Sequence, residues 1–529
     1  MKTSILPVKL SLYLIFIFLY SGNSFGQLGL PEWPLVTGFP QSGATIDNIS
    51  TTTHQYIDWS SGVPVAVDIP GTGSNQIGPS QAGINACNRM VFYCLHNGEY
   101  SASSSRLQLF MPDGTPINII GGDMNANAGD DEVQVVRRPG QPNQWFVIYS
   151  LAPTSYHSHP GYQSSFLAYS LIEVSGNTAT YVNSSTTGTP IQDRILTVGG
   201  TAYTYFQGKA TSSVSFVGSH DVYAQRRYHP FGSTSVGSSF QVDKFVIGSG
   251  TDIVYVESSP TITGYSWSLI AAGSPIEIDP SGNQLAVMAR SQTDNEQEVY
   301  LFDISSSSAF TSSPPSTIAF SGLLIDFDTP ISVGSSAPSQ YHAPIEFDGS
   351  PGTSYDWLQN MERKIRSIEF SSSGQYLYFT GGGHVSGGRG NLSYLGQIDL
   401  STPGPNHITR LQVQTSDPSN SYNSATGGGL TWSSSNYTNL WLYNGMSRIQ
   451  TCFDGNMYFT KSYDQELHVI PNPNSPMPID LVPHDVSLAN AFHPNVTMNG
   501  FVNYMPDQID GYDYSISGYS QTSFLQTIA

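Results

Sequence analysis

The feature that most constrains this chain is a strand–turn–strand unit that recurs along it. Three copies are clearest, namely residues 276–304, 365–400 and 448–470, which turn at 279–282, 371–374 and 454–455. Looser copies occupy 84–117 and 132–181. In each copy a short alternating strand meets a turn, and further strands follow it. Such units predict antiparallel meanders joined by tight turns.

Repetition of this unit predicts an all-β β-propeller, in which four-stranded antiparallel blades surround a central channel. The turn positions lie 92 residues apart (280 to 372) and 81 residues apart (372 to 453). Because a blade repeats about every 40 to 50 residues, each interval fits two blades or one blade with a long insertion. We favour seven blades, and six or eight blades are the alternatives. A β-sandwich array is the alternative fold, since regular short strands suit either architecture.

The composition agrees with an all-β domain. Charged residues make up 11% of the chain, against about 25% in average soluble domains. Glycine (51) and proline (34) are abundant, and hydrophobic residues reach 38%. Strands and turns favour this set of residues, whereas helices favour alanine, leucine and long charged residues. The hydrophobic content is sufficient for a large core.

The first residues predict a secretory signal peptide. Lys2 and Lys9 precede a compact apolar run at 10–20, and small or polar residues occupy 21–26. We expect cleavage before Gln27, which assigns 1–26 to the signal peptide and 27–529 to the propeller domain. The alternative is a membrane anchor, but the run is too short to span about 30 Å of hydrocarbon comfortably. The expected location is therefore extracellular or on the outer cell surface, with no membrane-spanning segment.

The charge of the chain restricts its partners. The formal net charge is −20, and only 19 Lys and Arg residues are spread over 529 positions. Binding to nucleic acid needs clustered positive charge, so we expect no nucleic-acid partner. The same balance disfavours adhesion to anionic lipid. The charge is compatible with a protein or a glycan as the ligand.

Three cysteines occur, at Cys87, Cys94 and Cys452. A two-residue hairpin turn at 88–89 would place Cys94 opposite Gly83 and several residues away from Cys87. That separation exceeds the reach of a disulfide, so small buried thiols are favoured over a Cys87–Cys94 bond. The sequence contains no CxxC and no zinc pattern.

Four segments resemble a known family. They are NRMVFYC with LFMPDGTPI (88–94 and 109–117), VVRRPGQPNQWFVIY (135–149), IEIDPSGNQLAV (276–287) and RIQTCFDGNMYFTKS with HVIPNPN (448–462 and 468–474). Their pattern resembles the N-terminal propeller of large surface proteins of gliding bacteria, which commonly carry polycystic-kidney-disease-type domains and a type IX secretion signal. The resemblance covers most of 80–515, and 190–265 match it weakly. It implies a secreted or surface protein, associated with attachment or gliding motility, whose role is non-enzymatic or unassigned.

Two segments carry candidate metal ligands. Residues 123–132 place oxygen-bearing side chains at alternate positions, as calcium loops do, but Gly129 and Gln134 depart from the EF-hand pattern. One interpretation is a calcium site of less regular geometry. The favoured interpretation is an Asx-rich surface turn. His157 and His159 could share a face of a strand and hold a metal, although a loop beside Pro160 is favoured.

Candidate catalytic groups are few. Ser219, His220 and Asp221 are consecutive, and adjacent side chains diverge in a strand, so they predict no catalytic triad. Asp303 and Asp399 recur at one position of the repeat, which indicates turn capping. The sequence assigns no catalytic, cofactor-binding or metal-ligating residue, and no cofactor is expected unless the calcium interpretation holds.

Three functional hypotheses follow. The favoured one is a non-enzymatic binding or surface-interaction protein. The second is a secreted hydrolase of polysaccharides, which would need two carboxylates about 5 to 9 Å apart in the central channel. The third is a structural component of an envelope assembly. Fold class alone does not choose among them.

Overall fold

The computed structural model describes the sheets and many of the turns that join their strands. The described residues are 32–40, 49–58, 65–69, 81–84, 90–97, 106–126, 133–151, 165–213, 219–230, 239–263, 276–290, 297–305, 316–319, 364–384, 391–401, 408–416, 449–451, 456–459, 466–470, 472–476, 492–497 and 501–502. Their regular structure consists of β-strands, which confirms the predicted all-β class. Within these ranges, no helix has the length and apolar character needed to cross a membrane.

Each sheet is named here after its first strand. The β1 sheet contains β1 (Glu32–Pro40), β2 (Ile49–Asp58), β3 (Val65–Ile69) and β31 (Phe501–Val502). The β4 sheet contains β4 (Gln81–Ile84), β5 (Met90–Asn97) and β6 (Arg106–Phe110). The β8 sheet contains β8 (Gln134–Arg137), β9 (Gln144–Leu151), β10 (Ser165–Ser175) and β11 (Thr178–Tyr181), with β7 (Asn118–Ile120) and β12 (Arg194–Ile195) beside them.

The second half of the chain continues this pattern. The β14 sheet contains β14 (Thr201–Ser213), β15 (His220–Pro230), β16 (Ser239–Ile247) and β17 (Ile253–Ser258), with β13 (Thr197–Val198) and β18 (Ile262–Thr263). The β19 sheet contains β19 (Ile276–Ile278), β20 (Gln284–Arg290), β21 (Gln297–Asp303) and β22 (Ser316–Ala319). The β23 sheet contains β23 (Lys364–Phe370), β24 (Tyr376–His384), β25 (Asn391–Asp399) and β26 (Ile408–Ser416). The β27 sheet contains β27 (Gln450–Thr451), β28 (Met457–Phe459), β29 (Glu466–Ile470) and β30 (Phe492–Thr497).

Within a sheet, most strands follow chain order and run antiparallel to their neighbours; the short strands β12 and β18 pair out of order with β10 and β16, and three further departures matter for the architecture. First, β31 pairs with β1, which brings the two ends of the described chain into one sheet. Second, β10 pairs with β14 through Ser165 and Phe166, so the β8 and β14 sheets are continuous. Third, β7 runs parallel to β11.

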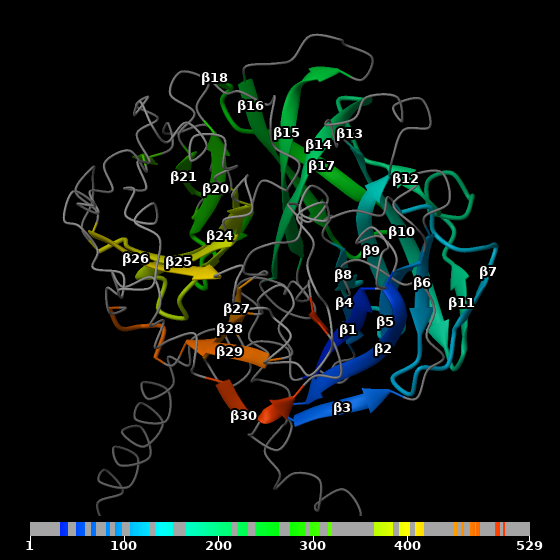
Figure 1. Ribbon diagram of the computed structural model, residues 1–529. Coiled ribbons are helices and arrows are strands. Elements are labelled where there is room, and N and C mark those ends of the chain that lie inside the picture. The colour runs from blue at the N-terminus through cyan, green and yellow to red at the C-terminus, as the bar shows by residue number, and fades with distance from the viewer. Residues whose placement is uncertain are drawn as a thin grey trace, which may run out of the picture.

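The sheets follow one another around a ring (Figure 1). The first strands of successive sheets contact each other, as β1 with β4, β4 with β8, β14 with β19, β19 with β23, and β23 with β27. The contact between β3 and β30 completes the circuit. The first strands of the other sheets therefore lie on the inner side of the ring, whereas in the β1 sheet β31 lies at the edge beside β1.

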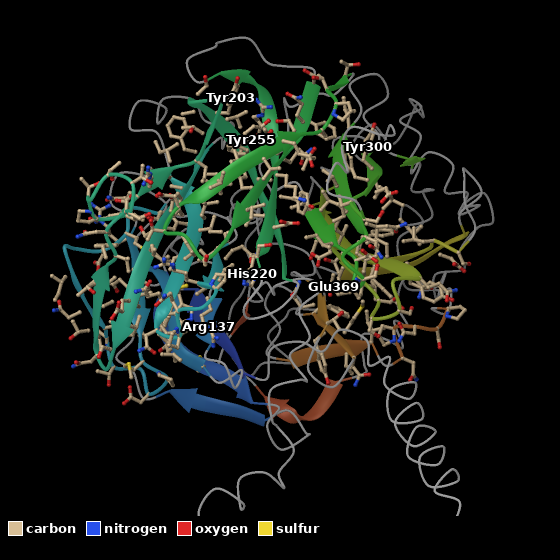
Figure 2. All side chains as sticks on the ribbon, turned by 180° about the vertical axis from the view of Figure 1, so that it is seen from behind. Arg137, Tyr203, His220, Tyr255, Tyr300 and Glu369 are labelled. Atoms are coloured by element: carbon tan, nitrogen blue, oxygen red, sulfur yellow. The ribbon has the colours of Figure 1, made fainter. Side chains whose placement is uncertain are left out.

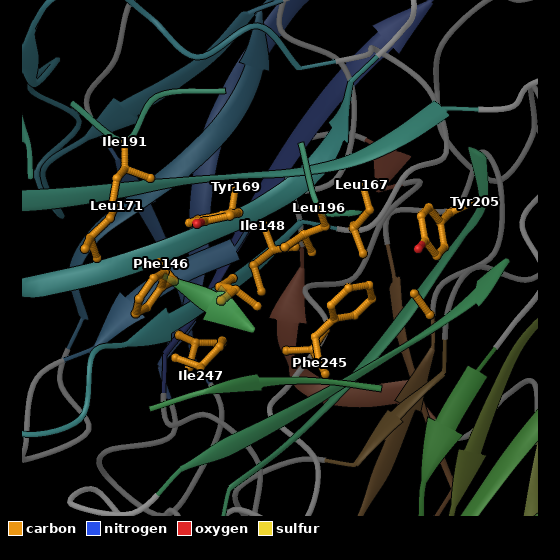
Figure 3. Close-up of a cluster of buried hydrophobic side chains, with 14 of the residues drawn as sticks. Phe146, Ile148, Leu167, Tyr169, Leu171, Ile191, Leu196, Tyr205, Phe245 and Ile247 are labelled. Atoms are coloured by element: carbon orange, nitrogen blue, oxygen red, sulfur yellow. The ribbon is translucent and has the colours of Figure 1, made fainter. Parts of the chain in front are cut away.

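Hydrophobic clusters fill the seams between successive sheets. In β9, Phe146 and Ile148 face a cluster shared with Phe245 and Ile247 of the β14 sheet (Figure 3). The alternate residues of β9, Trp145 among them, face a second cluster shared with the β4 sheet. Three further clusters join β14 to β19, β19 to β23, and β23 to β27. Since both faces of a strand are covered, its sequence is an uninterrupted apolar run rather than an alternating one.

The two ends of the ring differ in how their strands are joined. At one end, first strands turn into second strands through short connections such as 279–283 and 371–375. We call this the short-turn end. The Cβ position of Gly374, in the second of these turns, lies 3.6 Å from Asp279 Oδ2 in the first, so the turns are neighbours. At the opposite end, last strands are joined to the next first strands, in places by long connections such as 320–363 and 417–449.

Two details of the sequence interpretation need correction or extension. Cys94 lies opposite Gln81 and not opposite Gly83, because a bulge follows Gly83 and Ile84 pairs with Met90. Cys94 is nevertheless a buried thiol, as predicted. Cys87 and Cys452 lie outside the described residues. The segment 190–265, which lacked the repeat motifs, contains the long strands β14 to β16.

Candidate functional site

The acidic residues that recur in the repeat are turn formers. Asp279 Oδ1 accepts hydrogen bonds from the backbone N–H groups of Asn283 (2.7 Å) and Gln284 (2.6 Å), which closes the turn after β19. Asp303 and Asp399 make matching contacts two residues onward: each Oδ1 accepts from the N–H (3.0 Å) and hydroxyl (2.6 Å) of a following serine. This confirms turn capping as their role.

Other carboxylates fasten neighbouring sheets at the short-turn end. Asp252, after β16, forms a 2.6 Å ion pair with Arg194 of β12 and accepts a 3.0 Å hydrogen bond from the Thr186 hydroxyl. In the same seam, the Arg138 guanidinium donates to the carbonyl oxygen of Ser249 at 2.7 and 3.1 Å. These contacts link the β8 and β14 sheets.

The seam between the β23 and β27 sheets is fastened in a similar way. Glu369 of β23 accepts from Gln450 Nε2 (3.0 Å) and from the backbone N–H of Thr451 (3.2 Å). Glu277 occupies the matching position of β19, two residues before the turn. Both glutamates are buried on inner strands. Within the described residues, they are two acidic side chains at matching positions on neighbouring inner strands.

A buried ion pair lies within the β14 sheet. Arg226 Nε of β15 is 2.8 Å from Asp243 Oδ2 of β16, an ion pair that lacks the alignment of a hydrogen bond. Asp243 also accepts from the hydroxyls of Tyr205 (2.8 Å) and Ser258 (2.6 Å). The Tyr203 ring covers the guanidinium, with its centroid 4.2 Å from Cζ. Burial raises the pKa of the Asp243 carboxyl, and the attraction of Arg226 opposes that rise.

His220 is a buried group whose hydrogen bonding is incomplete. It is the first residue of β15, next to the short-turn end, and only 3% of its surface is exposed. Its Nδ1 has no hydrogen-bond partner in the described part of the chain. Burial, and to a smaller degree the positive charge of Arg137, lower the pKa of His220 to about 4. Figure 2 shows His220 and Glu369 on either side of the middle of the ring, with Arg137 below His220 in this view.

The low pKa of His220 predicts a specific loss of stability in mild acid. In the unfolded chain His220 takes up a proton near pH 6.5, but in the folded chain it does so only near pH 4. The stability that the neutral imidazole contributes to the folded state is therefore fully present above pH 6.5 and is lost progressively as the pH falls to about 4. The expected loss is about 3 kcal/mol. Urea unfolding at pH 7 and at pH 4 should show a smaller difference for His220→Phe than for the natural chain. Equal differences in both proteins would contradict the prediction.

The structure places some of the sequence candidates and not others. His220 and Asp221 point to opposite faces of β15: His220 is buried, whereas Asp221 forms a 3.1 Å ion pair with Lys244. The consecutive Ser-His-Asp therefore forms no triad, as expected. His157 and His159 lie outside the described residues.

The candidate calcium loop is described only at its start. Residues 123–126 are described and 127–132 are not. The Asn125 side-chain amide donates to Asp193 Oδ2, and its backbone N–H donates to Asp193 Oδ1 at 2.9 Å. These contacts fix the segment against the β8 sheet. Among the described residues, no group of three or more His, Cys, Asp or Glu side chains is placed to hold a metal.

Sequence reasoning missed Asp193, Asp252 and the Arg226–Asp243 pair. Each makes its contacts across strands or across a seam, at separations of 15 to 68 residues. No local motif marks such residues. The only local signal was a pair of charged residues between apolar ones, as at Asp243 and Lys244 in β16.

Comparisons with known proteins add little. No family profile matches the sequence, and no curated protein matches it. Similar solved structures include the β-propeller domain of the Trilobed protease from Pyrococcus furiosus, with TM-score 0.31 and 6% identity over 85% of this chain and 92% of that one. A prolyl endopeptidase has TM-score 0.27 and 11% identity over 93% of this chain and 63% of that one. A GH43_12 protein from a capybara gut metagenome has TM-score 0.25 and 11% identity over 90% and 95%. All three TM-scores are too low to support an inference.

Proposed function

We propose that the chain is an exported β-propeller of seven blades that binds a ligand and does not transform it. Each sheet named above would be one blade, with the continuous β8 and β14 sheets counted as two. The ring of inner-strand contacts and the apolar seams support this interpretation. The pairing of β31 with β1 would close the ring by completing the first blade with a C-terminal strand.

The proposed location follows from the first residues. A basic start, a short apolar run and small residues at 21–26 favour a cleaved signal peptide. The mature chain would act outside the cell or on its outer surface. The net charge of −20 suits a self-repelling, soluble exterior protein.

The observation that carries the binding role is the use of the acidic side chains. Asp279, Asp303 and Asp399 hold turns, while Asp252 and Glu369 hold seams. A carboxylate that accepts two or more hydrogen bonds from the scaffold has fewer acceptor positions left for a ligand. These contacts make the short-turn end rigid, whereas the long connections lie at the opposite end. Binding residues concentrate on such connections when a rigid scaffold positions them.

We infer that the ligand is a protein or a glycan, engaged during surface attachment or gliding motility. The test is to titrate the purified chain against a glycan array and against whole-cell surface extracts, while sugar release from the same polysaccharides is measured. The expected result is saturable binding without release. Turnover without saturable binding would overturn the proposal.

A polysaccharide hydrolase is the second candidate, favoured by the matching positions of Glu277 and Glu369 on neighbouring inner strands. If sugar release is detected, Glu277→Gln and Glu369→Gln identify its source. Loss of release in both variants, with release retained in the turn-capping control Asp303→Asn, would favour the hydrolase. Release that persists in both would exclude this acidic pair.

A further inference from the structure

The strand β17 forms the outer edge of the β14 sheet. One side of β17 pairs with β16, and among the described residues no strand pairs with its other side. The corresponding last strands β6 and β11 are covered, because Pro116 and Met124 form bridges to β6 and β7 pairs with β11. Alternate N–H and C=O groups of an unpaired edge point away from the sheet and can pair with another chain. The edge of β17 is therefore open to a further strand.

Two large apolar side chains are exposed along this edge. Val254 has 58% of its surface exposed and Val256 has 46%. Among the described residues, the other exposed large hydrophobic side chain is Ile120 of β7. Tyr255, which lies between the two valines and is labelled in Figure 2, instead packs against Phe245 with ring centroids 5.9 Å apart. Adjacent exposed apolar side chains, unlike scattered ones, indicate a contact surface.

The face of the sheet that carries Val254 also carries acidic groups. Residues directly opposite each other on neighbouring strands point to the same face. The pairing therefore aligns Asp221 and Val246 with Val254, and Lys244 with Glu257 in the next row. Lys244 forms a 3.1 Å ion pair with Asp221, and its side chain is 9% exposed against 31% for that of Asp221. Since Glu257 is only half-buried, the charge that meets solvent beside the valines is negative.

A bulge limits how long an added strand can be. Tyr255 lies opposite Phe245 and Glu257 lies opposite Lys244, so Val256 has no partner on β16. A bulge bends its strand and ends regular pairing. A segment that adds to β17 would therefore be short. Its affinity would depend on side-chain contacts as well as on main-chain hydrogen bonds.

We propose that the edge of β17 binds an extended segment of a partner protein by strand addition. Apolar residues of that segment would contact Val254 and Val256, and its Lys or Arg residues would face Asp221 and Glu257. A second copy of this chain fits poorly, because the net charge of −20 and the acidic groups beside the valines would repel it. As the last strand of its sheet, β17 lies on the outer side of the ring, away from the inner first strands. The proposal is thus separate from ligand binding by the long connections.

The first test uses a short peptide that alternates valine and lysine as the probe. Its binding to the full chain is followed by fluorescence anisotropy at low and at high salt. We expect saturable binding that weakens with salt. The same peptide N-methylated at its central residues keeps its charge but cannot pair as a strand, and should bind about tenfold more weakly or less. No saturable binding of the unmodified peptide, or equal binding of both peptides, would overturn the proposal.

Variants of two edge strands locate the site. Val254→Lys should weaken peptide binding about tenfold or more, because it removes an apolar contact and adds a charge that repels the peptide. Ile120→Lys makes the same kind of change at an exposed side chain of β7 and should leave the affinity within about twofold. Glu257→Gln should weaken binding about threefold and reduce its dependence on salt. Unchanged binding by Val254→Lys would overturn the assignment to β17.

Two further measurements separate this surface from its alternatives. Sedimentation of the natural chain at rising concentration tests for a second copy at the edge. A dimer that Val254→Lys abolishes would overturn the proposed partner segment. Glycan binding by Val254→Lys should equal that of the natural chain, because that ligand is proposed for the end with the long connections. A peptide that fails to bind while glycan binding persists would reject this surface alone and leave the proposed function standing.

Discussion

Gly396→Ala is expected to destabilise the protein by about 3 kcal/mol. Gly396 of β25 lies directly opposite Phe379 of β24, and the phenyl ring occupies the space above the glycine. A Cβ atom added at Gly396 would lie 1.8 Å from Phe379 Cζ. The ring would have to leave its place in the apolar seam between the β19 and β23 sheets. Urea unfolding of the two proteins measures the difference.

The control is Gly248→Ala, because Gly248 has no atom within 4 Å of its Cβ position. We expect that change to lie within about 0.5 kcal/mol of zero. Phe379→Leu in the Gly396→Ala background should recover part of the loss, since the smaller side chain makes room for the methyl group. A neutral Gly396→Ala, or a double variant no better than the single one, would contradict this account.

The same arrangement occurs in a second sheet. Gly83 of β4 lies opposite Phe92 of β5, and an added Cβ would lie 2.1 Å from Phe92 Cε1. Glycine within a strand usually weakens it, but here an aromatic ring from the neighbouring strand covers the exposed backbone. These two glycines therefore serve packing rather than turn geometry.

The parts of the fold that could be predicted from sequence are those with local causes. The turns at 279–282 and 371–374 were found because aspartate, serine and glycine form such turns through contacts within a few residues. The strands on either side followed from their apolar runs. The spacing of Asp303 and Asp399 relative to these turns was likewise enough to identify them as caps.

The parts that could not be predicted depend on pairing across the ring. The predicted register of β4 and β5 was wrong because the bulge after Gly83 changes the partner of Cys94. No residue pattern in the sequence indicates this bulge. His220 was noticed only as part of a consecutive Ser-His-Asp. Its burial depends on which face of β15 meets the β8 sheet. The electrostatic effect on its pKa comes from Arg137, 83 positions away (137 to 220).

The second large effect is expected at the buried ion pair of the β14 sheet. Arg226→Met should cost about 3–5 kcal/mol at pH 7, because Asp243 would keep a buried charge without its cationic partner. The loss of Arg226 would also remove the attraction that opposes the rise in the pKa of Asp243. Since the folded-state pKa would then lie further above the unfolded one, the variant's deficit should shrink as the pH falls and Asp243 takes up a proton.

The double variant decides whether the charge pair or the packing is responsible. Asp243→Asn alone should also be destabilising, because it leaves the buried guanidinium without its anion. If the charges are the cause, Arg226→Met with Asp243→Asn should be less destabilised than the sum of the two single variants, by about 1–3 kcal/mol. Strictly additive losses, with no change in the Arg226→Met deficit between pH 7 and pH 5, would instead assign the cost to the stacking of Arg226 against Tyr203. The charges would then be incidental to the stability of this sheet.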